Sequence, residues 1–211
     1  FHCAALISFA PNDYNQLKKI NIEGTANIVN LCISYSIQKL CYVSSVATMG
    51  FDPIRISEET TWKSEEVKNV YALTKYAAEK EVWRGIQEGV PCVIVNPGVI
   101  LGPGYFNSGS GLIFKIIRKG LMYKTNGITG YVDVNDVVKS MLLLMSDKHL
   151  NERYIIVGKT LSFSELTSKI SKSLSRFSCS REAFSVGFFF SRSSMLPPFS
   201  YEIKFWSIQY S

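Results

Sequence analysis

Residues 39–50, KLCYVSSVATMG, begin as a continuous apolar run and end in small, hydroxyl-bearing residues. Such a run is typical of a strand buried on both faces, as the strands of parallel sheets are. Before it, residues 1–9 form another short apolar run, and residues 17–37 carry apolar side chains at mostly helical spacing. The order up to residue 50 is therefore strand, helix, strand.

The same alternation continues to about residue 174. A polar, turn-rich segment, 51–69, leads into a second amphipathic helix, and a Gly-Val-Pro break precedes another buried strand within 89–104. The later elements are helices at 111–123 and 134–147, a strand at 152–158, and a helix at 162–174 whose Ser162 and Glu165 have capping-box spacing. Strands separated by helices predict an α/β fold, a doubly wound parallel sheet with helices on both faces.

Composition excludes several classes of protein. The chain has 211 residues, of which 46% are hydrophobic and 19% charged, as in ordinary globular domains. Its longest apolar runs fall far short of the roughly 20 residues that a membrane-spanning helix needs, so we expect no membrane span. The net charge is +6, but the basic residues are spread out. This predicts some preference for anionic ligands and no nucleic-acid interface.

The metal-binding residue types lack a metal-site pattern. Five cysteines have no C-x-x-C spacing and mostly lie in apolar runs, which predicts reduced core thiols in a cytoplasmic protein. His2 and His149 have no second ligand at metal spacing, and we expect no metal site. Asp133 and Asp136 lie where a short strand turns into a helix, so we interpret them as capping residues.

The two ends of the chain are unusual. The first residue is Phe1 rather than Met, which suggests a piece of a longer chain. Residues 175–211 are crowded with Ser and Phe and have no clear period. We weigh two interpretations of this irregular tail, a poorly packed or disordered segment and the product of a frameshift, and assign it no function.

A tyrosine and a lysine stand four residues apart on the helix near 69–83. Tyr71 and Lys75 share one helical face, so the phenol and the ammonium can approach the same point. A nearby cation is expected to lower the pKa of the phenol, which makes Tyr71 a plausible general acid/base. Ser44, Ser45 and Thr48 follow a predicted strand, at the sheet edge where α/β proteins bind ligands.

Six segments in order resemble one known family. They are HCAA (2–5), NIEGTANIVNLC (21–32), VSSVATMG (43–50), YALTK (71–75), NPGVILGPG (96–104) and GYVDVNDVV (130–138). On these motifs the sequence resembles the extended short-chain dehydrogenase/reductases, the NAD-dependent epimerase/dehydratase group. Within it, the dihydroflavonol-reductase and 3β-hydroxysteroid-dehydrogenase-like branch looks closest. The similarity covers residues 1–174. Six motifs in the family's order are a far more specific signal than a single motif would be.

The resemblance implies a Rossmann-type fold and specific residue roles. Tyr71 would be the acid/base, Lys75 would lower its pKa and hold the nicotinamide ribose, and Ser45 would bind the reacting oxygen, with Ser44 as its nearest rival. Asn21 falls at the family's helix asparagine, where catalytic support and structure are hard to separate. The cofactor, NAD or NADP, would be lined by Ala4, Ala5, Val43, Ser44, Tyr71, Lys75, Pro97, Gly98 and Val99.

The family's phosphate-binding Gly-x-x-Gly-x-x-Gly turn is not found in the sequence. It would precede Phe1, together with the first strands and the residue that separates NAD from NADP, so we expect an amino-terminally truncated domain over 1–174. The glycines at 102–104 and 108–111 lack the strand–turn–helix context of a phosphate cradle. Substrate-binding segments are expected around 102–130 and after 150.

The implied reaction is reduction of a small-molecule ketone or aldehyde to an alcohol. Two alternatives stay open: a nucleotide-sugar epimerase or dehydratase that uses the same tyrosine, and a non-catalytic dinucleotide-binding protein. The resemblance also implies a homodimer formed through the Tyr71 helix and the helix before it.

Overall fold

The computed structural model describes residues 1–50, 56–62, 69–104, 106–107, 109–120, 127–146, 148 and 150–182, with side chains up to residue 174. Its larger sheet has three parallel strands in the order β1 (Leu40–Val43), β2 (Cys92–Pro97) and β5 (Glu152–Ile156). Most of the irregular tail, from residue 183 on, lies outside these ranges, as do His149 and parts of 102–130.

The first apolar run lies against this sheet. His2 forms a parallel bridge with Tyr42, held by hydrogen bonds from His2 N to Cys41 O (2.8 Å) and from Val43 N to His2 O (3.0 Å). The amino terminus therefore runs beside β1 in the strand direction of the sheet. This places residues 3–5 at the carboxyl edge of the strands.

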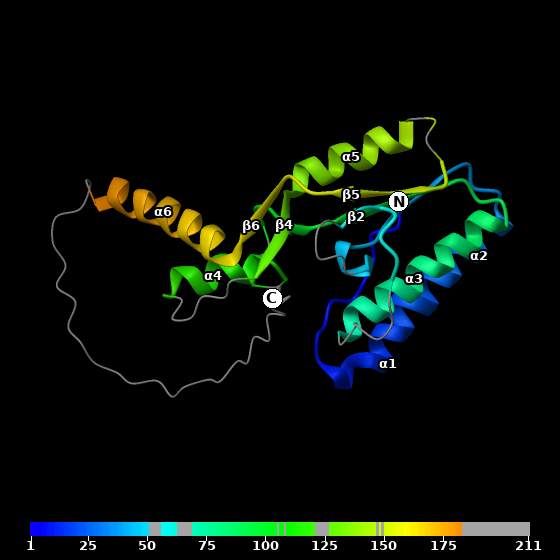
Figure 1. Ribbon diagram of the computed structural model, residues 1–211, viewed down its shortest axis with the longest axis horizontal. Helices are drawn as coiled ribbons and strands as arrows, with labels where there is room; N and C mark the ends of the chain where they lie inside the picture. Colours follow the sequence, from blue (N-terminus) through cyan, green and yellow to red (C-terminus); the bar gives the residue numbers. More distant parts are fainter. Residues whose placement is uncertain are drawn as a thin grey trace.

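Helices cover both faces of the larger sheet, which confirms the doubly wound architecture. On one face α2 (Gly24–Ser34) and α3 (Val70–Gln87) pack on β1 and β2, and on the other lies α5 (Val134–Ser146) (Figure 1). Successive strand residues alternate between the two cores. Those facing α2 and α3 are Leu40, Tyr42, Cys92 and Ile94, and those facing α5 are Cys41, Val93 and Val95.

The helical stretch predicted at 17–37 contains a wider turn. A 3-10 turn, η1 (Pro11–Asp13), leads to α1 (Tyr14–Leu17), and η2 (Lys18–Glu23) is a π-helical turn that runs directly into α2. A π-turn inside a helix often marks a functional site. Here it carries Asn21, which is 1% exposed.

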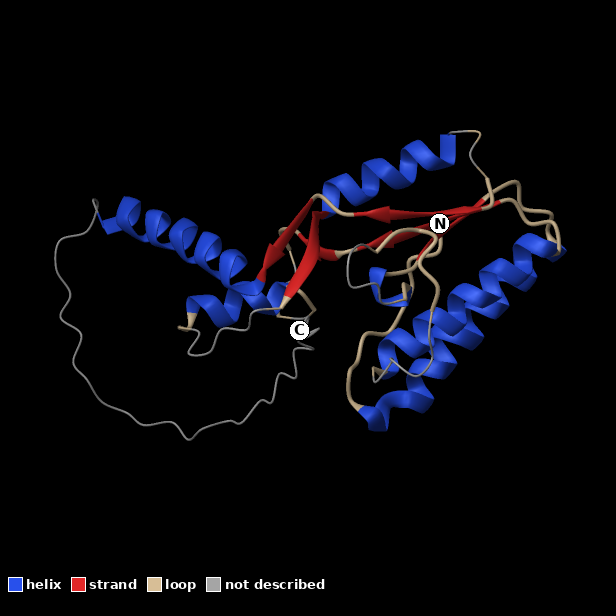
Figure 2. Cartoon of the chain, in the orientation of Figure 1, coloured by secondary structure: helices blue, strands red, loops and turns tan. Residues whose placement is uncertain are grey.

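A second, smaller sheet was not predicted. It has the order β3 (Val99–Leu101), β4 (Ile128–Asp133), β6 (Lys159–Ser162), with β3 parallel and β6 antiparallel to β4 (Figure 2). Two helices, α4 (Gly111–Arg118) and α6 (Phe163–Glu182), pack on it around a third apolar core. Parts of the segments expected to bind substrate thus form this second sheet and its helices, while β5 belongs to the larger sheet.

The start of α6 agrees with the prediction from sequence, but α6 ends later than predicted. The predicted capping box is confirmed: Ser162 N donates to Glu165 Oε2 (2.8 Å) and Glu165 N donates to Ser162 Oγ (3.2 Å). The helix continues to Glu182, so the backbone is regular over the first part of the tail that was expected to be irregular from residue 175.

Candidate active site

Two segments bring the predicted catalytic side chains to the carboxyl edge of the larger sheet. After β1 the chain passes through Ser44 and Ser45 into a short 3-10 turn, η3 (Val46–Thr48), and Ser45 Oγ accepts a hydrogen bond from Ala47 N (3.1 Å). Asn69 caps α3 by accepting from Tyr71 N (2.9 Å). Tyr71 therefore lies in the first turn of α3, facing the loop after β1.

Tyr71 and Ser45 are brought together. The Ser45 hydroxyl is close enough to the phenol to affect its pKa. Burial raises the pKa of Tyr71, and Ser45 partly opposes this rise. The phenol is therefore protonated at neutral pH and can donate its proton.

Lys75 is directed elsewhere. The whole residue is only 2% exposed, and its ammonium donates hydrogen bonds to Tyr42 OH (2.8 Å) and to Val43 O (2.9 Å). Burial lowers the pKa of Lys75 to about 8, with the Glu79 carboxylate opposing the shift. The prediction that Lys75 lowers the pKa of Tyr71 is wrong for this arrangement, because the ammonium faces Tyr42 and Val43 and burial of the phenol dominates.

The two neighbouring serines have different surroundings. Ser44 is buried, and its hydroxyl donates to Glu79 Oε2 (2.5 Å). Ser45 is half-buried, and its hydroxyl is close enough to Tyr71 to affect the pKa of the phenol. The geometry thus favours Ser45 over Ser44 as the hydroxyl beside the phenol.

Asn21 is fully engaged in structural contacts. Its Oδ1 accepts from Leu6 N (2.8 Å), and its Nδ2 donates to Leu6 O (3.0 Å) and to Thr74 Oγ1 (3.3 Å). These bonds fasten the segment after the His2 bridge to the helix that carries Tyr71. The side chain acts here as a support for α3.

The residues predicted to line the cofactor lie along one edge. Ala4 and Ala5 are exposed just beyond the His2 bridge, Val43 ends β1 and is followed by Ser44, and Pro97 ends β2. Parallel strands place their carboxyl ends at the same edge, where open α/β sheets bind ligands. Gly98 has a packing reason as well, since a Cβ there would lie 2.4 Å from Gly130 O.

Other predicted residues have structural partners. His2 Nε2 lies 3.0 Å from Thr25 Oγ1, within hydrogen-bonding distance, and Asp133 Oδ1 caps α5 by accepting from Asn135 N (2.7 Å). Within the described ranges no cluster of three His, Cys, Asp or Glu residues could hold a metal. Nor is any helix there long and apolar enough to cross a membrane.

The thiols largely follow the prediction. Cys3, Cys32, Cys41 and Cys92 are free, and only Cys3 among these four is exposed. Burial raises the pKa of Cys41 to about 11 and that of Cys92 to about 12, which keeps both protonated and unreactive.

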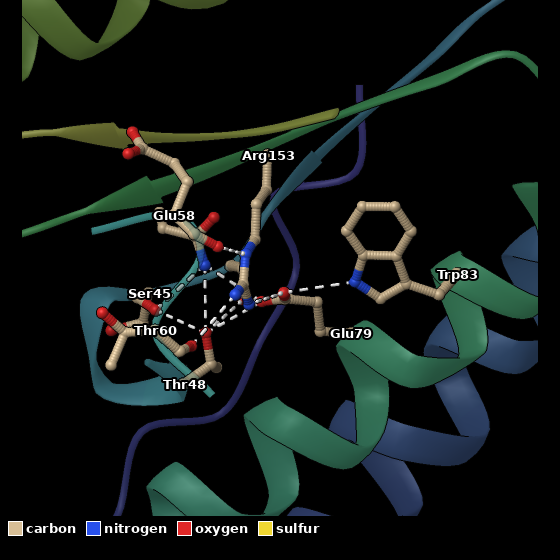
Figure 3. Close-up of polar contacts among 9 residues, drawn as sticks. Ser45, Thr48, Glu58, Thr60, Glu79, Trp83 and Arg153 are labelled. Carbon is tan, nitrogen blue, oxygen red and sulfur yellow. Dashed lines mark hydrogen bonds and ion pairs between the residues drawn. The ribbon is translucent and has the colours of Figure 1, made fainter. Parts of the chain in front are cut away.

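Sequence reasoning missed a polar cluster beside these residues. Glu79, one turn after Lys75 on α3, contacts Ser44, Thr48, Asn96 and Arg153 (Figure 3). The spacing of four residues from Lys75 placed Glu79 on the same helical face and could have signalled it. Nothing in the sequence pattern pointed to Arg153.

Comparison with known proteins places the chain in a family. Residues 1–152 match the family described as male sterility protein, an NAD-binding domain. Cinnamoyl-CoA reductase 1 of Petunia hybrida is 27% identical over 184 residues, covering 82% of this chain and 54% of the relative. A Synechocystis sp. protein provisionally named dihydroflavonol 4-reductase is 30% identical over 179 residues, covering 81% and 52%. The chain thus spans about half the length of these curated relatives.

Solved structures agree on the fold. The crystal structure of gox2253 has a TM-score of 0.72 and 27% identity, covering 79% of this chain and 52% of that one. A dTDP-glucose 4,6-dehydratase from Streptomyces venezuelae, DesIV, solved with NAD and TYD bound, has a TM-score of 0.72 at 18% identity, covering 82% and 56%. On the family match and this shared Rossmann-type fold, the chain belongs to the NAD-binding male sterility protein family, within the extended short-chain dehydrogenase/reductases.

Proposed function

We propose that this chain carries the catalytic residues of an NAD(P)-dependent reductase that converts a ketone or aldehyde to an alcohol. The observation that carries the proposal is that the Ser45 hydroxyl, in the turn after β1, and the Tyr71 phenol, in the first turn of α3, lie close together at the carboxyl edge of the sheet. Two hydroxyl groups there can bind one carbonyl oxygen, and the Tyr71 phenol, a stronger acid than a serine hydroxyl, has a proton to give. The two curated relatives described above are named as reductases, which supports this reaction over epimerisation or dehydration.

The proposed proton transfer uses residues of this chain. Ser45 and Tyr71 donate hydrogen bonds to the substrate carbonyl oxygen and polarise it. As hydride adds to the carbonyl carbon, the π electrons move onto the oxygen, which takes the Tyr71 proton and becomes the alcohol. The raised pKa of Tyr71 keeps the proton available until the oxygen becomes basic.

The residues at this edge fit the nicotinamide half of the cofactor. Bound NADH or NADPH supplies the hydride. The exposed, small side chains of Ala4 and Ala5 allow close approach, and the Pro97–Val99 backbone closes the other side. The buried Lys75 ammonium lies one turn from Tyr71 and offers a donor for the ribose hydroxyls.

The test is Tyr71→Phe in the full-length protein, assayed by oxidation of NADH and of NADPH with simple aldehydes and ketones. Loss of the proton donor should lower turnover by about 10²- to 10⁴-fold, while cofactor affinity, measured by fluorescence titration, stays within about twofold. The matched control is Tyr76→Phe on the same helix, whose ring stacks on Trp62 at 4.2 Å and should leave turnover unchanged.

Two other outcomes argue against the reductase. Absence of turnover in the wild type, with cofactor bound equally well by the wild type and by Tyr71→Phe, would favour a non-catalytic dinucleotide-binding protein. Tightly retained cofactor without net oxidation would favour an epimerase or dehydratase.

A homodimer through α2 and α3 is part of the proposal. Both helices expose apolar side chains on the outside of the molecule: Leu31 is 50% exposed and Leu73 41% exposed. Burial of such side chains against a second copy removes apolar surface from water. Sedimentation equilibrium should give twice the monomer mass for the full-length protein, and Leu73→Glu should shift it toward the monomer, whereas Leu142→Glu on α5 should not.

A further inference from the structure

A buried carboxylate on α3 holds the loop that carries Ser45. Glu79 is 1% exposed, and its Oε2 accepts hydrogen bonds from Ser44 Oγ (2.5 Å), Thr48 Oγ1 (2.8 Å) and Asn96 Nδ2 (2.9 Å). We propose that Glu79 is a positioning residue for the reaction, which fixes the 44–48 turn so that Ser45 faces Tyr71. The proposal rests on the proposed function, because it assigns Glu79 a part in the same reaction.

The hydrogen bonds reach Ser45 through its backbone. Thr48 Oγ1 lies 2.8 Å from Ser45 O, and Asn96 Nδ2 lies 3.2 Å from the same oxygen. Both groups also contact Glu79 Oε2. Thr48 has a single hydroxyl proton, which its two acceptors, Glu79 Oε2 and Ser45 O, share. The carboxylate thus helps to orient the Thr48 and Asn96 side chains beside the Ser45 carbonyl, and the Ser45 hydroxyl remains close to Tyr71.

The charge on Glu79 decides how Asn96 is oriented. A carboxylate only accepts hydrogen bonds, so Asn96 must turn its Nδ2 toward Glu79, and its Oδ1 then has no partner within the described part of the chain. A glutamine at residue 79 has one accepting oxygen and one donating nitrogen. It cannot accept from Ser44, Thr48 and Asn96 at Oε2 and keep an acceptor facing Arg153 at Oε1.

Arg153 balances the buried charge and connects it to a second loop. From β5 its Nη1 lies 3.4 Å from Glu79 Oε1, while Nε donates to Glu58 O (2.7 Å) and Nη2 to Thr60 O (3.2 Å) (Figure 3). Glu58 Oε1 also accepts from Ile155 N (2.9 Å). Glu79 therefore lies where α3, the Ser45 loop, β2 and β5 meet, 4 residues from Lys75 and 8 from Tyr71 along the same helix.

The experiment is a double-mutant cycle of Glu79→Gln and Ser45→Ala in the full-length protein, with carbonyl-dependent NAD(P)H oxidation as the assay. Glu79→Gln should lower kcat by about 10- to 100-fold, the range expected when a reacting group is misplaced. The KM for substrate and the cofactor Kd should stay within about twofold. In the Ser45→Ala background Glu79→Gln should cause no further loss, because Glu79 acts through Ser45.

The matched control is Glu81→Gln, the same change two residues along α3. Glu81 pairs with Arg84 at 2.9 Å and has 30% side-chain exposure, and within the described residues it makes no hydrogen bond or ion pair with the Ser45 loop. Glu81→Gln should leave kcat and KM unchanged both in the wild-type background and in the Ser45→Ala background.

If Glu79→Gln fails to fold, Thr48→Val takes its place. This variant keeps the Glu79–Arg153 pair and removes the hydroxyl that lies between Glu79 and the Ser45 carbonyl. It should give the same loss of kcat and the same non-additivity with Ser45→Ala.

The outcomes separate this proposal from the proposed function. Equal losses in the wild-type and Ser45→Ala backgrounds, or a lower Tm with unchanged kcat, would overturn the positioning role and leave Glu79 as structural. If Tyr71→Phe and Ser45→Ala themselves leave turnover unchanged, the proposed function fails, and the positioning role fails with it.

Discussion

Lys75 shows how burial changes the chemistry of a single residue. Its ammonium lies 4.5 Å from the centre of the Tyr42 ring and donates to the hydroxyl of that ring. Thr25 is close enough to the Tyr42 hydroxyl to affect its pKa, and it contacts His2 at 3.0 Å. The ammonium therefore lies at one end of a group of buried polar side chains that extends to the HCAA segment. Its low pKa results from loss of water, and the attraction of Glu79 offsets this only in part.

This pKa predicts a pH dependence of stability. Between about pH 8 and pH 10.5 the unfolded chain holds the Lys75 proton and the folded protein does not, so this residue makes the free energy of unfolding rise with pH in that window. Across this pH window, the free energy of unfolding of the wild type should rise by up to about 3 kcal/mol relative to that of Lys75→Met. Urea unfolding of both proteins at pH 7, 8, 9 and 10 measures the difference.

Lys80→Met, on the exposed side of the same helix, is the control for this measurement. The same rise relative to both methionine variants would show that burial of Lys75 is not its cause. A difference between wild type and Lys75→Met that stays constant with pH would contradict the lowered pKa.

Part of the site could be predicted from single residues and part could not. The Tyr71–Lys75 spacing and the serines after a buried strand were sufficient to predict that Ser45 and Tyr71 lie close together. The direction of the Lys75 ammonium was not predictable, because it depends on where Tyr42, in another element, places its hydroxyl. Arg153 was missed for the same reason, since its partner Glu79 is 74 residues away in sequence.

At the scale of elements, predictability follows burial. Every residue of β2 is buried, so its apolar run was readable from sequence. Two strands of the smaller sheet give no such signal: β3 has three half-buried residues, and β6 has one buried residue among four. Their pairing is set by contacts with α4 and α6, which a local pattern does not contain.

The π-turn η2 was also missed. Residues 18–23 contain no proline and only an ordinary mixture of polar and apolar side chains. What lies in this turn is Asn21, whose amide binds the Leu6 backbone on one side and Thr74 on the other. The π-turn thus coincides with a tertiary contact made by Asn21. The spacing of residues along the sequence does not predict such a contact.

At the scale of the whole molecule, the two sheets meet where β2 leads into β3. Gly98 lies at this junction, and its N–H donates to Ile156 O (3.1 Å). On the other side it faces Gly130 in β4, whose own space is limited by Val157. Two glycines therefore let the backbones of both sheets approach closely at the Pro97–Val99 segment, which directly follows Asn96, the residue that contacts Ser45 O.

Replacing Gly98 by alanine should separate the sheets. The new Cβ would lie 2.4 Å from Gly130 O and 2.8 Å from Gly130 C, and that backbone cannot move freely because β4 pairs with both β3 and β6. Overpacking of this kind costs about 1–3 kcal/mol or more. Thermal unfolding of the full-length protein should show a Tm lower by several degrees, and cofactor affinity should fall because the 97–99 segment shifts.

The matched control is Gly24→Ala in α2, where the nearest atom to a new Cβ is Lys19 O at 3.8 Å. Alanine fits there and favours the helix, so this variant should be neutral or more stable by up to about 1 kcal/mol. Opposite effects of the same substitution would place the cost at the contact between the sheets. Equal Tm values for the two variants would mean that Gly130 moves aside without cost, and that the close approach of the sheets does not depend on glycine at residue 98.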